Sequence, residues 1–411
     1  MSIGYSRRRW RWLVRLAAVL ATVPGAASAQ TPAVETGLSP RQVLIRLGSA
    51  AGEAGGGGPL SNVGEVIADL VGLEISTAPL GSSAGGFTFT FDPVTRTFSR
   101  AAPSFGPSFA ERAITAGEGR ASFGINFIRA TYDSLEGRNL RDGSMQTVSL
   151  RGPSGNDLYV GRAFLTVTSE STVFFTNVAL NDRFDVGLAV PYVRLHVDGR
   201  HVMDTEQVSG QGEASGIGDI ALRSKLRLVE QDGGGVALGL DLRLPTGDKE
   251  ALLGAGVTRA LISGIWSGTV GPFAPHASAG FEYWSDPFVI RNPLAGTNVA
   301  AGRHGIVYEA GLEWAPSSRV TLNGEVLGRW TRSGARLDYV ALDVRRPNPF
   351  DIQSAAVAAA SPAGLQRTSI AAGVKWNAFG SALFNASVLM PIRDAGLVDR
   401  LTPVFGIDWG F

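Results

Sequence analysis

The sequence predicts an all-β protein, a single antiparallel transmembrane β-barrel of about twelve strands with a small N-terminal appendage. Three observations predict this fold: long stretches of alternating polarity, connections that alternate between short and long, and an aromatic C-terminal strand. The chain has 411 residues, of which 53 are glycine and 44% are hydrophobic, a composition that suits many strands and turns. The chain has no cysteine, which excludes disulfides and thiolate metal or redox sites. Its net charge of +1 gives no electrostatic reason to expect a nucleic-acid partner.

The N-terminus has the pattern of a secretory signal peptide, which we place at residues 1–29. A basic stretch ends at Arg11, an apolar stretch covers residues 13–23, and small residues precede Gln30. A permanent N-terminal anchor is the alternative, but about eleven apolar residues are too few to cross a bilayer as a helix. We therefore expect cleavage near Ala29. The mature chain is then expected in the outer membrane of a Gram-negative bacterium as a closed barrel, because an open sheet leaves backbone groups unpaired in lipid.

Residues 30–119 differ from the rest of the chain and are expected to form the N-terminal appendage. Residues 50–59 are rich in glycine, which indicates a flexible linker. Asn62 and Glu65 have the spacing of a capping box, and the apolar residues that follow recur at helical spacing. These features predict a short helix at about residues 62–72.

A hairpin is predicted over residues 86–98. Phe87, Phe89 and Phe91 alternate with threonine there, and the turn signal Asp92-Pro93 follows. The whole appendage is interpreted either as a plug or periplasmic lid on the barrel or as a loosely ordered leader that packs against nothing. The composition of the segment leaves both interpretations open.

The clearest pair of strands lies between Gly216 and Asp248. Alternate residues of 217–229 and of 235–245 are apolar, and most residues between them are small or charged. This alternation describes a strand with a different solvent on each face. A membrane barrel has an apolar outer face and a polar inner face, and a spanning strand needs ~9–11 residues. We therefore expect the charged residues of this pair to line the lumen: Asp219, Arg223, Lys225, Arg227, Asp241 and Arg243.

The region 120–411 contains about twelve strands of this kind. The pair 304–315 and 319–332 adds Glu309, Glu313, Glu325 and Arg329 to the residues expected in the lumen. The strand at 163–180 alternates least clearly. The predicted spans are 120–132, 163–180, 183–196, 217–229, 235–245, 256–270, 273–285, 304–315, 319–332, 366–377, 381–391 and 402–411.

The connections between these strands alternate in length. The short ones are Asn181-Asp182, Gln231–Gly234, Gly271-Pro272, Pro316–Ser318 and Phe379-Gly380. Short turns on the periplasmic side and long loops on the outside are typical of outer-membrane barrels. The longest predicted loop, 333–365, is expected either to fold inward as a constriction or to stand outside as a receptor surface. The long loops are 133–162, 197–216, 246–255, 286–303, 333–365 and 392–401.

The C-terminal strand carries aromatic residues on one face. Phe405, Trp409 and the final Phe411 share that face of an alternating segment. A terminal phenylalanine on such a strand resembles the signal that outer-membrane barrels present to their assembly machinery. The three residues are therefore interpreted as an assembly signal, with the barrel assembly machinery and outer-membrane lipids as partners.

Two motifs resemble an outer-membrane family named for the meta pathway of phenol degradation. The first is Gly216-x-Gly218-Asp219-Ile220-x-Leu222-x-x-Lys225, followed by Leu244-Pro245-Thr246-Gly247-Asp248. The second is Asp182-Arg183-Phe184-Asp185-Val186-Gly187, followed by Pro191-Tyr192. The resemblance covers about residues 120–411 and leaves out the appendage. It implies a channel or transporter, in some members associated with the catabolism of aromatic compounds.

The sequence contains no motif that predicts catalysis, a cofactor or a metal site. Gly216-x-Gly218 opens a strand and lacks the third glycine of a nucleotide-binding loop. His196 and His201 lie near Asp204 and Ser209, so an enzyme site or a metal site there is conceivable, but the spacing matches no known arrangement. Solvated loop residues are the simpler interpretation, and we expect no enzyme, no cofactor and no bound metal.

Aromatic residues at strand ends predict the girdles that mark both membrane interfaces. A sugar-stacking track is the alternative, and it would require inward-facing rings. The residues are Trp266, Trp284, Trp314, Trp330, Trp376, Trp409, Tyr192, Tyr283 and Tyr308.

The predicted lumen has one mainly positive wall and one mainly negative wall. This arrangement predicts a transverse field that orients polar or anionic solutes. The alternative is that the charges pair across a packed, closed lumen. The function that follows is passive passage of small-molecule solutes, including aromatic or other hydrophobic compounds. A closed structural or surface barrel is the alternative, and an outer-membrane enzyme is a third, weaker one.

Overall fold

The computed structural model describes most of the chain from Val34 onward as one compact unit. Two predicted features lie outside the described residues: the signal peptide with its cleavage site, and Phe411. The described residues are 34–53, 63–83, 86, 88–92, 97–100, 102–151, 157–203, 206–231, 233–286, 288–292, 297–301, 303–345 and 352–410.

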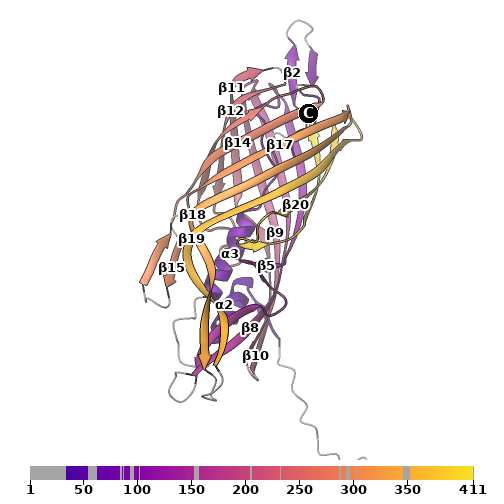
Figure 1. Ribbon diagram of the computed structural model, residues 1–411. Coiled ribbons are helices and arrows are strands. Elements are labelled where there is room, and N and C mark those ends of the chain that lie inside the picture. The colour runs from indigo at the N-terminus through magenta and orange to yellow at the C-terminus, as the bar shows by residue number, and fades with distance from the viewer. Residues whose placement is uncertain are drawn as a thin grey trace, which may run out of the picture. The chain divides into compact units, whose positions relative to one another are not determined.

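Twelve antiparallel strands close into a barrel, which confirms the predicted fold (Figure 1). Each strand pairs with the next around the ring, and the last strand pairs with the first through Phe405 opposite Phe127. Closure leaves no unpaired edge in the membrane-spanning wall. The strands are β4 (Ala121–Tyr132), β8 (Asp157–Asn181), β9 (Phe184–Met203), β11 (Ile220–Gln231), β12 (Gly234–Leu244), β13 (Arg259–Ser267), β14 (Phe273–Trp284), β17 (Gly305–Ser317), β18 (Val320–Arg345), β19 (Ile352–Asn377), β20 (Ala382–Pro391) and β22 (Thr402–Gly410).

Side chains alternate between the two faces of the wall as the sequence pattern predicts. Leu222, Leu226 and Leu228 of β11 are exposed on the outer face, whereas Lys225 and Arg227 of the same strand are buried inside. An apolar outer face and a polar inner face are the arrangement that a barrel needs when lipid surrounds it. Among the described residues, no helix combines the length and the hydrophobicity that a bilayer crossing requires.

The prediction of long loops is wrong at two places, because the strands continue there. Residues 333–365 were expected to form a loop, but β18 runs to Arg345 and β19 begins at Ile352, so the barrel hairpin is extended instead. Residues 197–216 are likewise taken up by the end of β9 and by β10 (Glu206–Ile217), which pairs with β9. Backbone pairing can continue beyond the bilayer without an apolar outer face, so the polarity pattern fades before the strand ends. The short connections lie at the opposite end of the barrel, near the C-terminus in Figure 1.

Several short strands lie at the end of the barrel that carries the extended strands. The loop after β4 contains β5 (Ser134–Leu135), β6 (Arg138–Asn139) and β7 (Met145–Arg151). β5 also pairs with β21 (Leu397–Val398). A separate hairpin is formed by β15 (Phe288–Asn292) and β16 (Thr297–Ala301).

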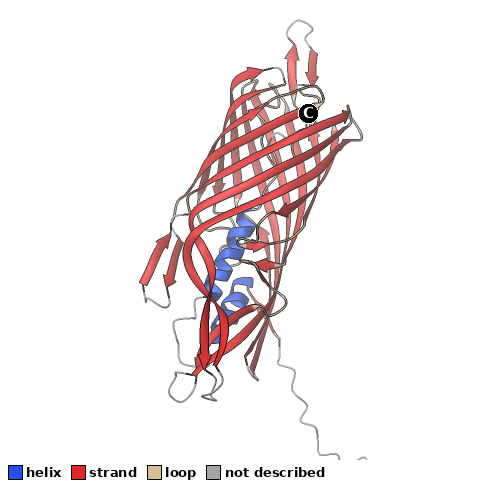
Figure 2. Ribbon diagram, in the orientation of Figure 1, coloured by secondary structure: helices blue, strands red, loops and turns tan. Residues whose placement is uncertain are grey.

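The N-terminal part begins at the end with the extended strands and enters the barrel. β1 (Glu35–Leu38) pairs in parallel with β10. Two helices follow, α2 (Pro40–Glu53) and α3 (Val63–Thr77), which are the blue elements inside the red strands of Figure 2. A hairpin of β2 (Phe89–Asp92) and β3 (Thr97–Arg100) stands at the end with the short turns (Figure 1).

Helix α2 was not predicted from the sequence, and its end lies in the segment predicted to be a linker. Residues 50–53, at the start of the predicted glycine-rich linker, form the last turn of this helix. Its beginning is fixed by a capping box, in which the Gln42 backbone N–H donates to Ser39 Oγ at 3.2 Å and the Ser39 N–H donates to Gln42 Oε1 at 2.8 Å. Helix α3 is longer than the predicted 62–72, because it continues to Thr77.

The two helices pack against the inner wall through apolar side chains. Leu44 and Leu47 of α2 and Leu70 and Val71 of α3 share a buried cluster with wall residues such as Leu195. Burial of one large apolar side chain stabilises a fold by ~1.5–3 kcal/mol. This cluster therefore holds the helices inside the half of the barrel that carries the extended strands.

Candidate functional site in the barrel lumen

Two segments from the N-terminal part occupy the barrel lumen, and together we call them the plug: residues 63–83 and residues 102–116. The first segment contains α3, and the second runs past wall strands to the short turn between β8 and β9. At that turn, Thr115 Oγ1 donates to the backbone carbonyl of Asp182 at 2.7 Å. The plug therefore passes through the lumen from one end of the barrel toward the other.

Glu325 of β18 binds the plug through its backbone. Its Oε1 accepts the N–H of Ser108 at 2.6 Å, and its Oε2 accepts the N–H groups of Phe109 and Ala110 at 3.0 and 2.8 Å. Only 3% of the residue is exposed. Three backbone donors on one buried carboxylate satisfy a charge that could not otherwise be buried at low cost.

Arg112 of the plug forms an ion pair with the same side of the wall. Its Nη2 lies 3.2 Å from Glu313 Oε2 of β17 and donates to the carbonyl of Ser104 at 3.1 Å. Lys375 of β19 donates to the carbonyl of Pro107 at 2.7 Å. The acidic wall predicted from the sequence is thus in contact with residues 104–112.

The basic residues of β11 and β12 contact the plug as well. Arg223 forms an ion pair with Asp241 at 3.0 Å and donates to the carbonyl of Gly81 at 2.7 Å. Lys225 lies 3.6 Å from Glu111, and Arg243 donates to the carbonyl of Ser76 at 2.8 Å. Arg227 pairs with Glu230 at 3.2 Å, within its own strand.

The two predicted walls are therefore bridged by the plug and do not face each other across open water. Glu111 reaches the basic wall, and Arg112, the next residue, reaches the acidic wall. Of the two interpretations drawn from the sequence, this geometry agrees with charges that pair inside a packed lumen. The pairing partners are plug residues, which the pattern of the wall strands alone could not identify.

Asp219 was predicted to line the lumen, but its carboxylate binds the backbone of the loop that follows β12. Its two carboxylate oxygens accept the N–H groups of Gly247 at 3.2 Å and Ala255 at 2.9 Å, and Oδ2 lies 3.6 Å from Arg259 Nη2. Thr246 Oγ1 donates to the carbonyl of Gly218 at 2.7 Å. The glycine–aspartate motif before β11 thus shapes the loop that follows β12, which explains why the two motifs occur together.

Four wall residues near the plug were missed by the sequence reading: Arg259, Glu282, Arg367 and Lys375. Arg259 is 1% exposed and donates to the carbonyl of Ser76 at 2.6 Å. Arg367 contacts the carboxylate of Glu74, and Arg329 contacts that of Glu282. Glu74 lies on α3, where burial raises its pKa above the usual value and the Arg367 guanidinium acts in the opposite direction. Strand parity could have found Arg259, Glu282 and Lys375, because each has an outward apolar neighbour, whereas Arg367 lies between the polar residues Gln366 and Thr368.

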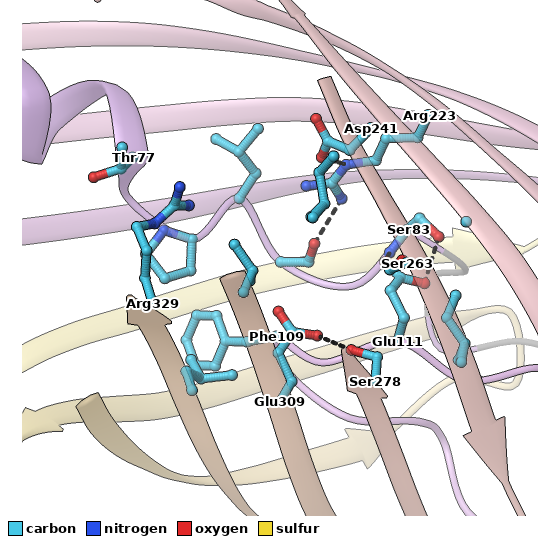
Figure 3. Close-up of a pocket in the computed structure, with 18 of the residues that line it drawn as sticks. Thr77, Ser83, Phe109, Glu111, Arg223, Asp241, Ser263, Ser278, Glu309 and Arg329 are labelled. Atoms are coloured by element: carbon cyan, nitrogen blue, oxygen red, sulfur yellow. Dashed lines mark hydrogen bonds and ion pairs between the residues drawn. The ribbon is translucent and has the colours of Figure 1, made fainter. Parts of the chain in front are cut away.

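A cavity of about 200 Å³ remains between the plug and the wall. Figure 3 shows Arg223 and Asp241 on one side of it and Glu309 with Ser278 across from them. Ser278 Oγ donates to Glu309 Oε2 at 3.0 Å, and Ser83 Oγ donates to Glu111 at 2.6 Å. A second cavity of about 130 Å³ lies on another side of α3, near Ile75, Tyr132 and Leu389. The packed lumen therefore keeps space for small molecules.

The histidines considered for catalysis or metal binding are engaged in other contacts. His196 Nδ1 lies 3.0 Å from Glu213, and His201 Nε2 lies 2.8 Å from Thr147 Oγ1. Asp204 is outside the described residues. Across the part of the chain that the structure describes, no group of three or more His, Asp or Glu side chains is placed to hold a metal ion.

The predicted aromatic girdle holds for most of its members and is wrong for Trp284. Trp266 is 46% exposed on the outer face, whereas Trp284 is 2% exposed and donates from Nε1 to Glu282. Arg259 lies 4.8 Å from the Trp284 ring centroid. Strand parity explains the difference, because the adjacent Tyr283 faces outward. In the C-terminal strand, Phe405 is exposed and Trp409 stacks on Phe123, with ring centroids 6.0 Å apart.

Comparisons with solved structures find outer-membrane proteins at low similarity. An outer membrane channel from Pseudomonas putida F1 is 14% identical, with 73% of this chain and 98% of that chain covered and a TM-score of 0.42. A Pseudomonas aeruginosa FadL homologue is 11% identical, with 82% and 98% covered and a TM-score of 0.35. The Ralstonia pickettii toluene transporter TbuX is 12% identical, with 72% and 90% covered and a TM-score of 0.34.

No curated protein matches this chain. One family model does match, and its description is MetA-pathway of phenol degradation. The match covers residues 138–284, which include both motifs quoted from the sequence but neither the plug nor the C-terminal strands. Residues 138–284 therefore match the MetA-pathway of phenol degradation family, which confirms the resemblance that the motifs indicated over this part of the chain.

Proposed function

We propose that this chain is an outer-membrane channel for the passive passage of small organic molecules, and that the plug closes its lumen in the conformation described above. One observation carries the proposal: residues 102–116 are held to the wall by hydrogen bonds and ion pairs. Glu325, Glu313 and Lys375 make these contacts. Water can replace such bonds when a segment moves, whereas it cannot replace an apolar core. The polar wall is then available to solutes.

A closed barrel with a structural or surface role is the second candidate. The apolar cluster between the two helices and the wall favours it, because buried leucines such as Leu44 and Leu70 would hold the plug in place permanently. The extended β18–β19 hairpin adds a large surface at the same end of the barrel. The two candidates differ in one measurable property, which is whether solutes cross the wall.

The solute class that we propose is small aromatic or other hydrophobic compounds. The family description refers to phenol degradation, which supports this class. The size of the cavity of about 200 Å³ supports it as well, because ~150 Å³ is enough to hold a benzene ring, although charged side chains also line this cavity. The proposed function involves no catalysis. A channel selects its solutes by the radius of its pore and by the side chains that line the pore wall.

We further propose that the protein reaches the outer membrane after signal-peptide cleavage near Ala29. The barrel assembly machinery would recognise the C-terminal strand through Phe405, Trp409 and Phe411. The outward exposure of Phe405 supports this role, since a recognition residue must be accessible before the barrel closes.

Liposome swelling tests the channel proposal. The mature protein is reconstituted, and the liposomes are challenged with L-arabinose and, at pH 8, with sodium benzoate. A channel is expected to produce swelling above that of protein-free liposomes and of liposomes that carry heat-unfolded protein. Heat-dependent gel mobility establishes that the reconstituted protein is folded. If liposomes with folded protein swell no faster than protein-free liposomes in every solute, the closed barrel is favoured.

A further inference from the structure

The C-terminal turn of α3 is bound by arginines from the wall. Arg243 and Arg259 donate to the same acceptor, the carbonyl of Ser76, at 2.8 and 2.6 Å. Two residues earlier, Arg367 contacts the carboxylate of Glu74. The last carbonyls of a helix carry partial negative charge, and guanidinium groups are the usual partners of carboxylates. Glu74 and Ser76 therefore occupy positions that suit an anionic ligand.

The arginines hold more donors than the plug uses. Nε and Nη1 of Arg259, and Nε and Nη2 of Arg367, are buried and have no hydrogen-bond partner. A guanidinium has five N–H donors, and a buried donor left unpaired is unfavourable until it finds an acceptor. Arg367, which lines the cavity described next, thus retains capacity for further acceptor atoms, whereas Arg259 is not among the lining residues.

The cavity of about 200 Å³ lies beside two of these arginines, Arg243 and Arg367. Arg243, Arg367 and Glu74 line it together with the apolar side chains of Leu80, Phe109 and Leu327. Leu80 and Phe109 are buried and belong to one apolar cluster, against which Leu327 packs. A single aromatic ring fits a space of this size, and the charged and apolar linings together suit a molecule that has a ring and an anionic group.

Other carboxylates of the cavity do not offer a comparable site for a cation. Asp241 is already paired with Arg223 and Arg243, at 3.0 and 3.5 Å. Glu309 accepts from Ser278, and Glu111 accepts from Ser83 and faces Lys225. Each of these acids has a donor in place, whereas Arg367 keeps its Nε and Nη2 donors without an acceptor.

We infer that Arg243 and Arg367 form a binding site for the carboxylate of a single-ring organic acid whose ring lies against Leu80, Phe109 and Leu327. The carboxylate of this ligand competes with Glu74 for Arg367, and Arg259 shares the carbonyl of Ser76 with Arg243. The inference rests on the proposed channel function and adds the charge of the solute. A ligand that replaces the contacts of α3 would also weaken the hold of the wall on the plug.

Calorimetric titration of the full-length mature protein in detergent tests this site. Sodium benzoate at pH 7.5 is the probe, benzyl alcohol has the ring without the charge, and acetate has the charge without the ring. Saturable benzoate binding is expected, with benzyl alcohol and acetate at least tenfold weaker. Equal binding of benzyl alcohol would overturn the role of the arginines. Equal binding of acetate would overturn the role of the ring.

Variants distinguish binding at this site from a general effect of positive charge on the wall. Arg243→Gln and Arg367→Gln are each expected to weaken benzoate binding at least tenfold. The matched control Arg227→Gln should leave it unchanged, because Arg227 lies on the same wall but pairs with Glu230 and does not line the cavity. Heat-dependent mobility on a denaturing gel establishes that each variant is folded.

Glu74→Gln gives a second test that does not depend on loss of binding. Removal of the competing carboxylate leaves the Arg367 charge unpaired, so benzoate should bind at least threefold more tightly. The double variant Glu74→Gln/Arg367→Gln, which buries no unpaired charge, should bind benzoate as weakly as Arg367→Gln. Unchanged affinity in both Arg367→Gln and Glu74→Gln would overturn the inference. Arabinose swelling reports on the channel separately, so arabinose flux without benzoate binding would refute only the site.

Discussion

Arg112 of the plug and Glu313 of β17 form an ion pair at 3.2 Å inside the barrel, and the Glu313 side chain has no exposed surface. The two residues are 201 positions apart in the chain. Burial of two charges costs several kcal/mol per ion unless the pair and its hydrogen bonds compensate. The pair therefore links the docking of the plug to the electrostatics of the wall.

Removal of one member of this pair is expected to loosen the plug. Arg112→Met leaves Glu313 buried without its arginine partner, with only the His276 imidazole 3.4 Å away, which should destabilise docking of residues 102–116 by ~3–5 kcal/mol. Hydrogen exchange of that segment measures the change. The double variant Arg112→Met/Glu313→Leu should recover most of the protection, and equal protection in Arg112→Met and the wild type would contradict the pairing.

Glu325 is expected to control the backbone of residues 108–110. Glu325→Gln removes the charge that three N–H groups share, and a hydrogen bond to a charged group is worth ~1.5–3 kcal/mol. The amides of Ser108, Phe109 and Ala110 should exchange at least tenfold faster, while those of α3 change little. Glu213→Gln is the control, since Glu213 is exposed and contacts only His196 among the interactions described. Unchanged exchange in Glu325→Gln would refute the carboxylate's role.

Asp219 is expected to stabilise the loop between β12 and β13. Asp219→Asn replaces a carboxylate oxygen that accepts a backbone N–H with an amide donor, and should lower stability by ~1.5–3 kcal/mol. The temperature at which gel mobility changes reports this loss. Asp198→Asn serves as the control, because the half-buried Asp198 of β9 accepts only a side-chain hydrogen bond, from Gln211, among the interactions described. Equal transition temperatures for the two variants would argue against the explanation given for the motif.

Tryptophan quenching distinguishes the outer and inner faces of the wall. Brominated lipids quench only rings that reach the hydrocarbon. Trp266→Phe should therefore reduce the quenchable fraction of the fluorescence, and Trp284→Phe should increase it, because the unquenched Trp284 is lost. A decrease with Trp284→Phe would place that ring in the girdle after all.

The barrel could be predicted from the sequence because lipid on one face and polar groups on the other enforce a period of two. The alternation predicts Arg223 and Glu325 on the inner face. It also predicts Trp284 there, because Trp284 is adjacent to Tyr283, which faces outward. The extension of β18 to Arg345 could not be read, because paired strands outside the bilayer need no apolar face. Ser39 and Gln42 carry the capping box of α2, and the glycine-rich sequence after them concealed the helix.

The partners of the wall charges could not be predicted from the strands. Glu325 and Arg243 bind backbone groups of the plug, at Ser108 and Ser76, and a backbone acceptor or donor leaves no mark in the sequence. The sequence offered two alternatives for the lumen, a transverse field and a packed interior. The choice depended on residues more than 100 positions away in the chain.

The most direct test of the account is the current through a barrel whose plug can be fixed and released. Ser108 and Asn323 are joined by a side-chain hydrogen bond of 2.9 Å, and the native chain has no cysteine. Ser108→Cys and Asn323→Cys can therefore be combined and bridged by a short bis-methanethiosulfonate cross-linker. In planar bilayers we expect the bridged protein to conduct at least tenfold less than the unbridged double variant, and a reductant should restore the current. Equal conductance before and after bridging would contradict the claim that residues 102–116 close the path.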